Sequence, residues 1–93
     1  MAYIAKADGT KEPIATPISL KQAQKAVGGY VQRFFINGLP LLCDEEGLIK
    51  RKPLNERVTQ MAQEAMASFA IAQPFVGDII VFETKKEAKG WIR

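Results

Sequence analysis

The side chains that could carry out chemistry in this sequence are concentrated in one stretch, residues 43–57. The stretch begins with the only cysteine, Cys43, continues through three carboxylates at 44–46, and then contains the basic run 50–52. The sequence has no histidine, so the Ser-His-Asp and Cys-His arrangements of hydrolases are excluded. Cys43 comes late in a predicted apolar strand, which favours a buried packing thiol over a nucleophile.

The three adjacent carboxylates, Asp44, Glu45 and Glu46, are the remaining candidates for catalysis or metal binding. Calcium-binding loops place their oxygen ligands at alternate positions, and three adjacent carboxylates in a turn rarely converge on one point. No apolar surroundings are visible that would raise the pKa of one carboxyl group for acid–base work. We therefore expect a solvated acidic turn, no metal, no cofactor and no enzymatic activity. A small metal-dependent hydrolase that uses these residues is the least favoured alternative.

Basic and aromatic side chains make a binding function more credible than catalysis. Gly28 and Gly29 fit neither the dinucleotide nor the P-loop pattern, and they end a predicted helix whose C-terminus repels phosphate. Tyr30, which comes directly after them, could still stack on a base while nearby cations hold the phosphates. The candidate ligand-binding residues are Tyr30, Arg33, Lys50, Arg51, Lys52 and Arg57.

The charge balance leaves two explanations of these cations open. The net charge is only +3, whereas dedicated nucleic-acid-binding proteins gather basic residues on one face. Each of two groups is either an anion site or a solvated surface, and the solvated surface is the favoured explanation. The groups are the run 50–52 with Arg57, and a looser C-terminal group of Lys85, Lys86, Lys89 and Arg93.

A β-hairpin is predicted for residues 30–43. Asn37-Gly38 is a strong signal for a two-residue type I′ turn, which pairs Ile36 with Leu39. One face then carries Phe34, Leu41 and Cys43, and the other carries Val31, Phe35 and Leu42 with Arg33 among them. Because both faces are largely apolar, we infer that a partner subunit covers the second one, with Val31, Phe35 and Leu42 as the candidate interface. A cover from the N-terminal arm or C-terminal segment of the same chain is an equally good explanation.

The helices and the remaining strand have clear local signatures. Ser19 and Gln22 match a capping box for a short helix at 20–27, which glycine at position 28 ends. Asn55 is the expected N-cap of a long helix at 56–72, whose apolar residues recur at helical spacing. Those residues are Val58, Met61, Ala62, Ala65, Phe69 and Ala72. The continuously apolar run within 78–83 is typical of a central strand.

The two ends of the chain are expected to form smaller elements. Residues 1–17 indicate two extended segments around Asp8-Gly9, and Pro13 and Pro17 restrict this arm to a sheet edge. Thr84 and Glu87 match a second capping box, which opens a short helical turn at 84–93. Together the patterns predict an α+β fold in one domain, 1–93, in which a small antiparallel sheet packs with a long and a short helix.

The size of the chain favours assembly into oligomers. A domain of 93 residues buries a small core, and one cysteine cannot supply a disulfide. Oligomerisation is the remaining common way to bury more surface.

The sequence also indicates where the protein is located. No apolar run approaches the ~20 residues that span a bilayer, and no signal peptide is apparent. A lone cysteine is typical of a reducing compartment. We therefore expect a cytosolic homo-oligomer without membrane contact.

Four segments occur here in an order that resembles a known group of proteins. They are residues 26–31 (AVGGYV), 44–47 (DEEG), 53–55 (PLN) and 76–81 (VGDIIV). Together they are similar to a family of small uncharacterised proteins of tailed phages and large viruses, which share a V-G-G-Y element, an N/D-E-E-G turn and a P-x-N segment. Gln32 and the basic run 50–52 depart from that pattern. The resemblance implies a compact α+β domain of phage or prophage origin and brings no catalytic residues.

The residues and the resemblance together support two functional hypotheses. The leading one is a non-enzymatic, phage-encoded binding protein of the host cytoplasm. It would act in counter-defence or host takeover by binding a host protein or by sequestering a nucleotide signal. The alternative is a module that binds single-stranded nucleic acid or nucleotides weakly, through sheet aromatics and the basic loop at 50–57.

Overall fold

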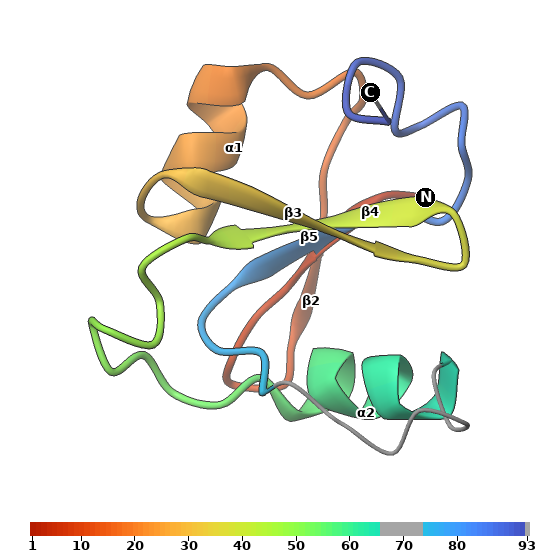
Figure 1. Cartoon of the computed structure of the whole chain (residues 1–93). Helices are drawn as coiled ribbons and strands as arrows, with labels where there is room; N and C mark the ends of the chain where they lie inside the picture. The colour runs from red at the N-terminus through yellow and green to blue at the C-terminus, as the bar shows by residue number, and fades with distance from the viewer. Residues whose placement is uncertain (66–73, 93) are drawn as a thin grey trace.

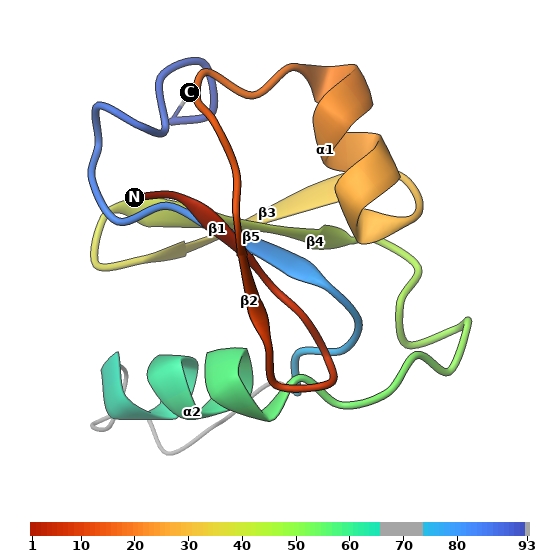
Figure 2. The ribbon, with the colours of Figure 1, turned by 180° about the vertical axis from the view of Figure 1, so that it is seen from behind.

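Over the residues that the computed structural model describes, 1–65 and 74–92, the chain forms a five-stranded antiparallel sheet with a helix on each face (Figures 1 and 2). The elements are β1 (Tyr3–Ala5), β2 (Lys11–Pro13), α1 (Leu20–Val27), β3 (Val31–Ile36), β4 (Leu39–Asp44), α2 (Glu56–Ala65) and β5 (Ile79–Val81). The strands lie side by side in the order β2-β1-β5-β4-β3. The predicted α+β class is therefore confirmed.

The β3–β4 hairpin has the predicted register. Ile36 pairs with Leu39, and Gln32 pairs with Cys43 further along. Asn37 and Gly38 have φ values of 52° and 81°, as a type I′ turn requires. The hairpin places β3 at one edge of the sheet, where β4 is its only neighbouring strand among the described residues.

The centre of the sheet combines a confirmed prediction with a correction. β5 is central as predicted, since it pairs with β1 on one side and β4 on the other. β2, which contains Pro13, lies at the far edge, as its proline requires. The prediction that the whole N-terminal arm lies at an edge is wrong for β1, because β1 pairs with both β2 and β5. The proline restricts only the strand that contains it.

Alternate residues of the strands point into two separate cores. On the α1 side, buried side chains of α1, the strands and the C-terminal turn pack together: Ala2, Ile4, Ile18, Ala23, Val27, Leu42, Ile80, Phe82 and Ala88. On the α2 side the core consists of Tyr3, Ala5, Leu41, Cys43, Val58, Ala62, Phe75, Ile79 and Val81. This alternation has the period of two that a strand imposes.

The chain itself covers most of the second face of the hairpin. Leu42 is fully buried in the α1-side core, and Val31 and Trp91 pack against that core. Trp91 is fixed there because its Nε1 donates a hydrogen bond to the carbonyl of Ile18 at 2.8 Å. Leu42 is therefore inaccessible to a partner subunit, and the expected interface of Val31, Phe35 and Leu42 is wrong for this residue. Phe35 stays 46% exposed.

The helix boundaries follow their caps. The Ser19–Gln22 capping box is formed, and Gly28 ends α1 in the left-handed conformation with φ 83°. α2 begins at Glu56, after Asn55 accepts a hydrogen bond from the Val58 N–H at 3.1 Å. The expected continuation of this helix over 66–72 lies outside the described residues. Among those described, no helix combines the length and apolar composition of a bilayer-spanning segment.

The C-terminal residues 84–92 form hydrogen-bonded turns, and in one of them the Ala88 N–H donates to the carbonyl of Thr84 at 3.3 Å, as in one turn of a helix. The second capping box is present, since the Thr84 hydroxyl accepts from the Glu87 N–H at 3.2 Å. Glycine at position 90 has φ 91°. Figure 1 shows this segment above the hairpin end of the sheet, on the same side as α1.

Candidate functional site

A buried carboxylate with two lysines marks the end of the sheet where β3 begins and β4 ends. Asp44 is the last residue of β4, and its side chain is only 1% exposed. Its Oδ2 lies 2.7 Å from Lys52 Nζ and 2.9 Å from Lys50 Nζ. The same ammonium groups donate to the last carbonyls of α1, from Lys52 to Val27 at 2.6 Å and from Lys50 to Gly28 at 3.2 Å. We call this arrangement the Asp44 junction.

The electrostatics of the junction favour the charged form of Asp44. Burial by itself would raise the pKa of this carboxyl group, but hydrogen bonds from Lys52 and Lys50 and from the Glu46 N–H outweigh burial and lower the pKa to about 2. The lysines also supply the positive charge that a helix C-terminus favours. The junction therefore joins α1, β4 and the loop after β4 through charge-assisted hydrogen bonds.

Gly29 provides the space for this junction. A Cβ atom at position 29 would lie 2.6 Å from Lys50 Nζ and 2.7 Å from Asp44 Oδ1. Gly28 serves the different purpose of a left-handed helix cap. The glycine pair thus ends α1 and also admits the buried ion pairs beside it.

The structure distributes the six predicted ligand-binding residues over several places. Tyr30, Lys50 and Lys52 lie at the Asp44 junction end, where Tyr30 is 67% exposed. Arg33 donates to the carbonyl of Trp91 at 2.8 Å, and Arg57 donates to the carbonyl of Gly9 at 3.0 Å. The sixth residue, Arg51, is exposed in the loop after β4 with φ 56°.

The basic loop and the acidic turn both differ from the expected solvated surfaces. Asp44 is buried, whereas Glu45 and Glu46 beside it are exposed. Lys50 and Lys52 are engaged with Asp44 and with helix carbonyls, so these lysines have a structural use inside the chain. An anion would compete there with a buried carboxylate, and this weakens the interpretation of residues 50–52 as a phosphate site.

Cys43 has the surroundings of a packing residue. Its thiol is buried, and burial together with the neighbouring Asp44 charge raises the pKa of Cys43 to about 11. Its Sγ donates to the carbonyl of Gln32 at 3.6 Å. Such a thiol is a poor nucleophile near neutral pH. Across residues 1–65 and 74–92, no group of three or more acidic or cysteine side chains is placed to hold a metal ion.

Asn55 explains why two of the sequence motifs meet in space. It is fully buried, and its Nδ2 donates to the carbonyls of Ala5 and Gly77, both at 2.8 Å. The Gly77 N–H in turn donates to the carbonyl of Pro53 at 2.8 Å. The P-L-N and V-G-D segments are therefore a structural clamp that holds the start of α2 against β1 and the approach to β5.

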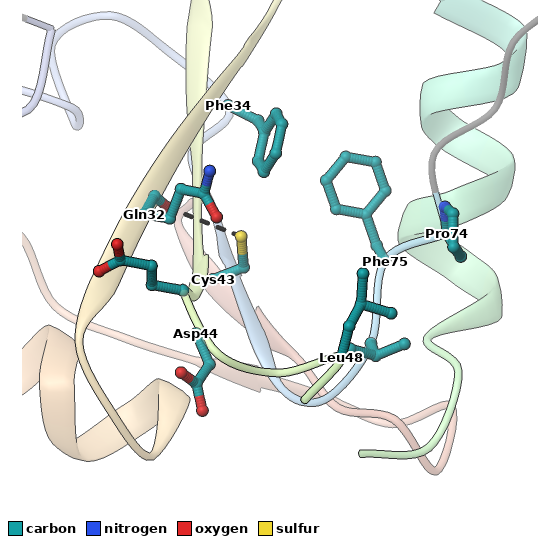
Figure 3. A pocket seen from close by; sticks show the side chains of 9 residues that line it. Gln32, Phe34, Cys43, Asp44, Leu48, Pro74 and Phe75 are labelled. Carbon is teal, nitrogen blue, oxygen red and sulfur yellow. Dashed lines mark hydrogen bonds between the residues drawn. The ribbon is translucent and has the colours of Figure 1, made fainter. Parts of the chain in front are cut away.

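A small hollow opens beside β3 on the α2 side, next to the Asp44 junction (Figure 3). Its volume is about 40 Å³, and its lining consists of Gln32, Phe34, Cys43, Asp44, Glu45, Leu48, Pro74, Phe75 and Val76. The rings of Phe34 and Phe75 meet edge to face with centroids 5.3 Å apart. Leu48 is 57% exposed at the rim. We call this feature the edge hollow.

The backbone of β3 alternates between β4 and the open edge. Residues that flank a two-residue hairpin turn form a hydrogen-bonded pair, so Ile36, Phe34 and Gln32 direct their backbone groups to β4. The backbone groups of Val31 and Phe35 consequently point away from β4. In the described part of the chain, β3 is the last strand on this side of the sheet.

The sequence interpretation did not find the Asp44 junction, although a signal was present. The last carbonyls of a helix need partners, and cations are favoured near them. A predicted helix that ends at Val27 therefore indicates that a cation lies near its last carbonyls, but the sequence does not distinguish Lys50 and Lys52 from the other basic residues for this role. The burial of Asp44 has no such local signal, because it depends on how β4 and α1 approach each other.

Comparison with known proteins identifies the family of the chain. A family model described as "Domain of unknown function (DUF3846)" matches residues 1–92. Neither a curated protein nor a solved structure matches the chain. The family description names no activity and no viral source, so the phage origin implied by the sequence motifs stays a prediction. Since the match extends over nearly the full sequence, the chain belongs to the DUF3846 family.

Proposed function

We propose that this chain is a non-enzymatic binding protein that takes an extended segment of a partner protein as an additional strand beside β3. The observation that carries this proposal is the position of β3, a six-residue strand at the sheet edge with the edge hollow beside it. Strand addition uses main-chain hydrogen bonds for affinity and pockets for alternate side chains for specificity.

The main-chain part of the site is the outward side of β3. Val31 and Phe35 direct their backbone groups to the edge, where a neighbouring strand can form main-chain hydrogen bonds with them. β3 contains neither proline nor lysine, and its six pairs with β4 run without interruption. Natural proteins usually protect such an edge with charged side chains, lysine above all, or with proline or a bulge. The one charged residue of β3 is Arg33, whose guanidinium group donates to the carbonyl of Trp91. A strand without lysine, proline or a bulge is suited to receive a neighbour.

The side-chain part of the site is the edge hollow. A strand added about 4.8 Å from β3 directs every second side chain to the α2 side, where Gln32 and Phe34 border the hollow. Its volume of about 40 Å³ suits a small side chain. Tyr30 and Leu48, 67% and 57% exposed, supply further apolar surface at the same end of β3.

The biological setting of the proposal comes from the sequence resemblance. We propose a phage-encoded protein that acts in the host cytoplasm on a host protein. A nucleotide signal is less well supported as the ligand, because the lysines meant to hold its phosphates contact Asp44. A second copy of the chain also carries an open β3 edge, so we propose that the free protein forms homo-oligomers through this strand.

Selection of peptides tests the proposal although the partner protein is unidentified. A displayed library of random peptides of about ten residues should yield extended binders with Kd values of about 10–100 μM. Leu48→Asp should weaken these binders about tenfold, because it places a charge at the rim of the edge hollow. Leu20→Asp is the matched control, since Leu20 on α1 is also 57% exposed.

Three results would contradict the proposal. They are a failure to enrich peptides, an equal loss of affinity in both leucine variants, and binders that remain helical when bound. Oligomerisation is tested separately by sedimentation equilibrium up to about 1 mM, where weak self-association becomes visible. A strict monomer over this range would remove the homo-oligomer while leaving the peptide site intact.

A further inference from the structure

Acidic and basic side chains of the C-terminal turn have different partners. The carboxylate of Glu87 accepts hydrogen bonds from the backbone N–H groups of Ala2 at 2.7 Å, Glu83 at 3.0 Å and Thr84 at 3.2 Å. Glu83 forms an ion pair with the amino group of Met1. Both acids of this segment therefore have partners other than lysine.

The lysines of the same segment are left facing solvent. Lys85 and Lys86 are exposed, and all three lysines of the segment, Lys89 included, lie beyond ion-pair distance of the carboxylates of residues 1–65 and 74–92. With Gly90 and Ile92 they line an open hollow of about 420 Å³. Within the described residues, three cations without a counter-charge thus surround one depression of the surface.

Strand β3 adds an aromatic ring and a fourth cation to this surface. The guanidinium group of Arg33 donates to the carbonyl of Trp91, in the C-terminal turn, and its Cζ lies 5.7 Å from the centroid of the Phe35 ring. A Cβ atom at Gly38, in the hairpin turn, would lie 3.6 Å from Lys85 Cε. The C-terminal turn and the hairpin end of β3 are therefore neighbours, as Figure 1 shows. We call Arg33, Phe35, Lys85, Lys86 and Lys89 the C-terminal patch.

We infer that the C-terminal patch binds single-stranded nucleic acid. An exposed aromatic ring stacks on a base, and surrounding cations hold the phosphates on either side. Phe35 is 46% exposed, with the Arg33 guanidinium beside it. Duplex nucleic acid keeps its base faces stacked inside the helix, so a ring of this kind selects single strands. The ring also distinguishes this surface from a purely cationic one, which would take any polyanion.

This site shares only Phe35 with the strand-addition site, which uses the Phe35 backbone where the C-terminal patch uses the ring, and the two sites otherwise differ in position and in chemistry. The edge hollow lies on the α2 side of β3 at the Asp44 junction, whereas the C-terminal patch lies on the α1 side near the hairpin turn. It also differs from the basic loop considered in the sequence, because Lys50 and Lys52 are committed to Asp44. The inference therefore does not depend on the proposed function.

Fluorescence anisotropy with a labelled oligothymidine of about 20 nucleotides tests the inference on the intact chain. Between about 50 and 200 mM NaCl, the affinity should fall with a log–log slope of roughly −2, as three lysine–phosphate contacts require. The variant Lys85→Ala/Lys86→Ala/Lys89→Ala should lower the affinity about tenfold or more and remove most of that slope. Phe35→Ala should weaken binding about tenfold with the slope unchanged, because stacking is not ionic.

A matched control removes the same amount of charge elsewhere. Lys6→Ala/Lys21→Ala/Lys25→Ala also deletes three lysines but leaves the C-terminal patch intact, so its slope should stay close to that of the unaltered chain. Equal weakening by both triple variants would overturn the inference, as would no binding at about 50 mM salt. Heparin bound as tightly as the oligonucleotide, with Phe35→Ala without effect, would show a general polyanion surface and would also overturn it. Circular dichroism confirms that each variant is folded.

Discussion

The ammonium group of Lys52 lies 2.7 Å from the buried carboxylate of Asp44 and 2.6 Å from the carbonyl oxygen of Val27. One ammonium group thus pairs with the carboxylate at the end of β4 and donates to the carbonyl at the end of α1. Lys50 repeats the arrangement with Asp44 and Gly28. The start of β3 and the loop beside the edge hollow are therefore held by the Asp44 junction, which makes it the support of the proposed binding site.

Asp44→Asn should destabilise the fold by about 3 kcal/mol, because it leaves two partly buried ammonium groups without their counter-charge. Urea unfolding followed by the fluorescence of Trp91, the single tryptophan, measures this change. Glu45→Gln is the neighbouring control and should change the free energy of unfolding by less than about 0.5 kcal/mol, since Glu45 is exposed. Equal effects of the two substitutions would show that Asp44 has no special structural role.

Acid should remove the contribution of Asp44 over a defined range. Its pKa is lowered from 3.8 to about 2 in the folded chain, so the charged form favours folding above pH 4 and this contribution is lost as the pH falls toward 2. The difference between the two pKa values corresponds to about 2 kcal/mol. Urea titrations at several pH values should show this loss in the unaltered chain and a flatter profile in Asp44→Asn. Parallel profiles would contradict the assignment.

Gly29→Ala should cost about 1–3 kcal/mol, because the new methyl group would meet Lys50 Nζ and Asp44 Oδ1 at 2.6 and 2.7 Å. A double-mutant cycle shows whether the cost comes from the Asp44 junction. In an Asp44→Ala background the same substitution should cost at least about 1 kcal/mol less, since the contact with the carboxylate is gone. An unchanged cost would assign the effect of Gly29→Ala to the backbone instead.

The Cys43 thiol should react slowly in the folded chain. Its pKa of about 11 and its burial predict alkylation by iodoacetamide at pH 8 at least about 100-fold slower than for an ordinary thiol. A Cys43→Ser/Ile49→Cys variant provides the comparison, because Ile49 is 80% exposed. Mass spectrometry measures both rates. Equal rates would mean that Cys43 is accessible and would reopen its assignment as a nucleophile.

Local signals predicted much of this fold correctly, and tertiary contacts explain the rest. Asn37-Gly38 determines its own turn and therefore the register of β3 with β4, and the Ser19–Gln22 box defines the start of α1. The position of Asp44 has no comparable local signal. Its partners are six and eight residues later in the sequence, and its burial arises only when α1 ends beside β4.

The same distinction applies to the candidate sites. The sequence indicates Tyr30, Arg33 and the basic residues as candidates, but it cannot show which cations are consumed inside the chain. The basic run 50–52 looks the stronger group because its members are adjacent, yet the structure engages two of them with Asp44. The looser C-terminal lysines keep their charge for a ligand, because Glu83 and Glu87 are occupied by the N-terminal residues.

Amide hydrogen exchange along β3, measured by NMR with and without a selected peptide, tests the central claim most directly. In the free chain the amides of Val31 and Phe35 should exchange rapidly and that of Phe34 slowly. Of these three amides, only that of Phe34 points toward β4. With peptide bound, the Val31 and Phe35 amides should slow at least about tenfold, since they become main-chain donors to the added strand. If both amides keep their rapid exchange in the complex, β3 does not receive a strand and the proposed function is wrong.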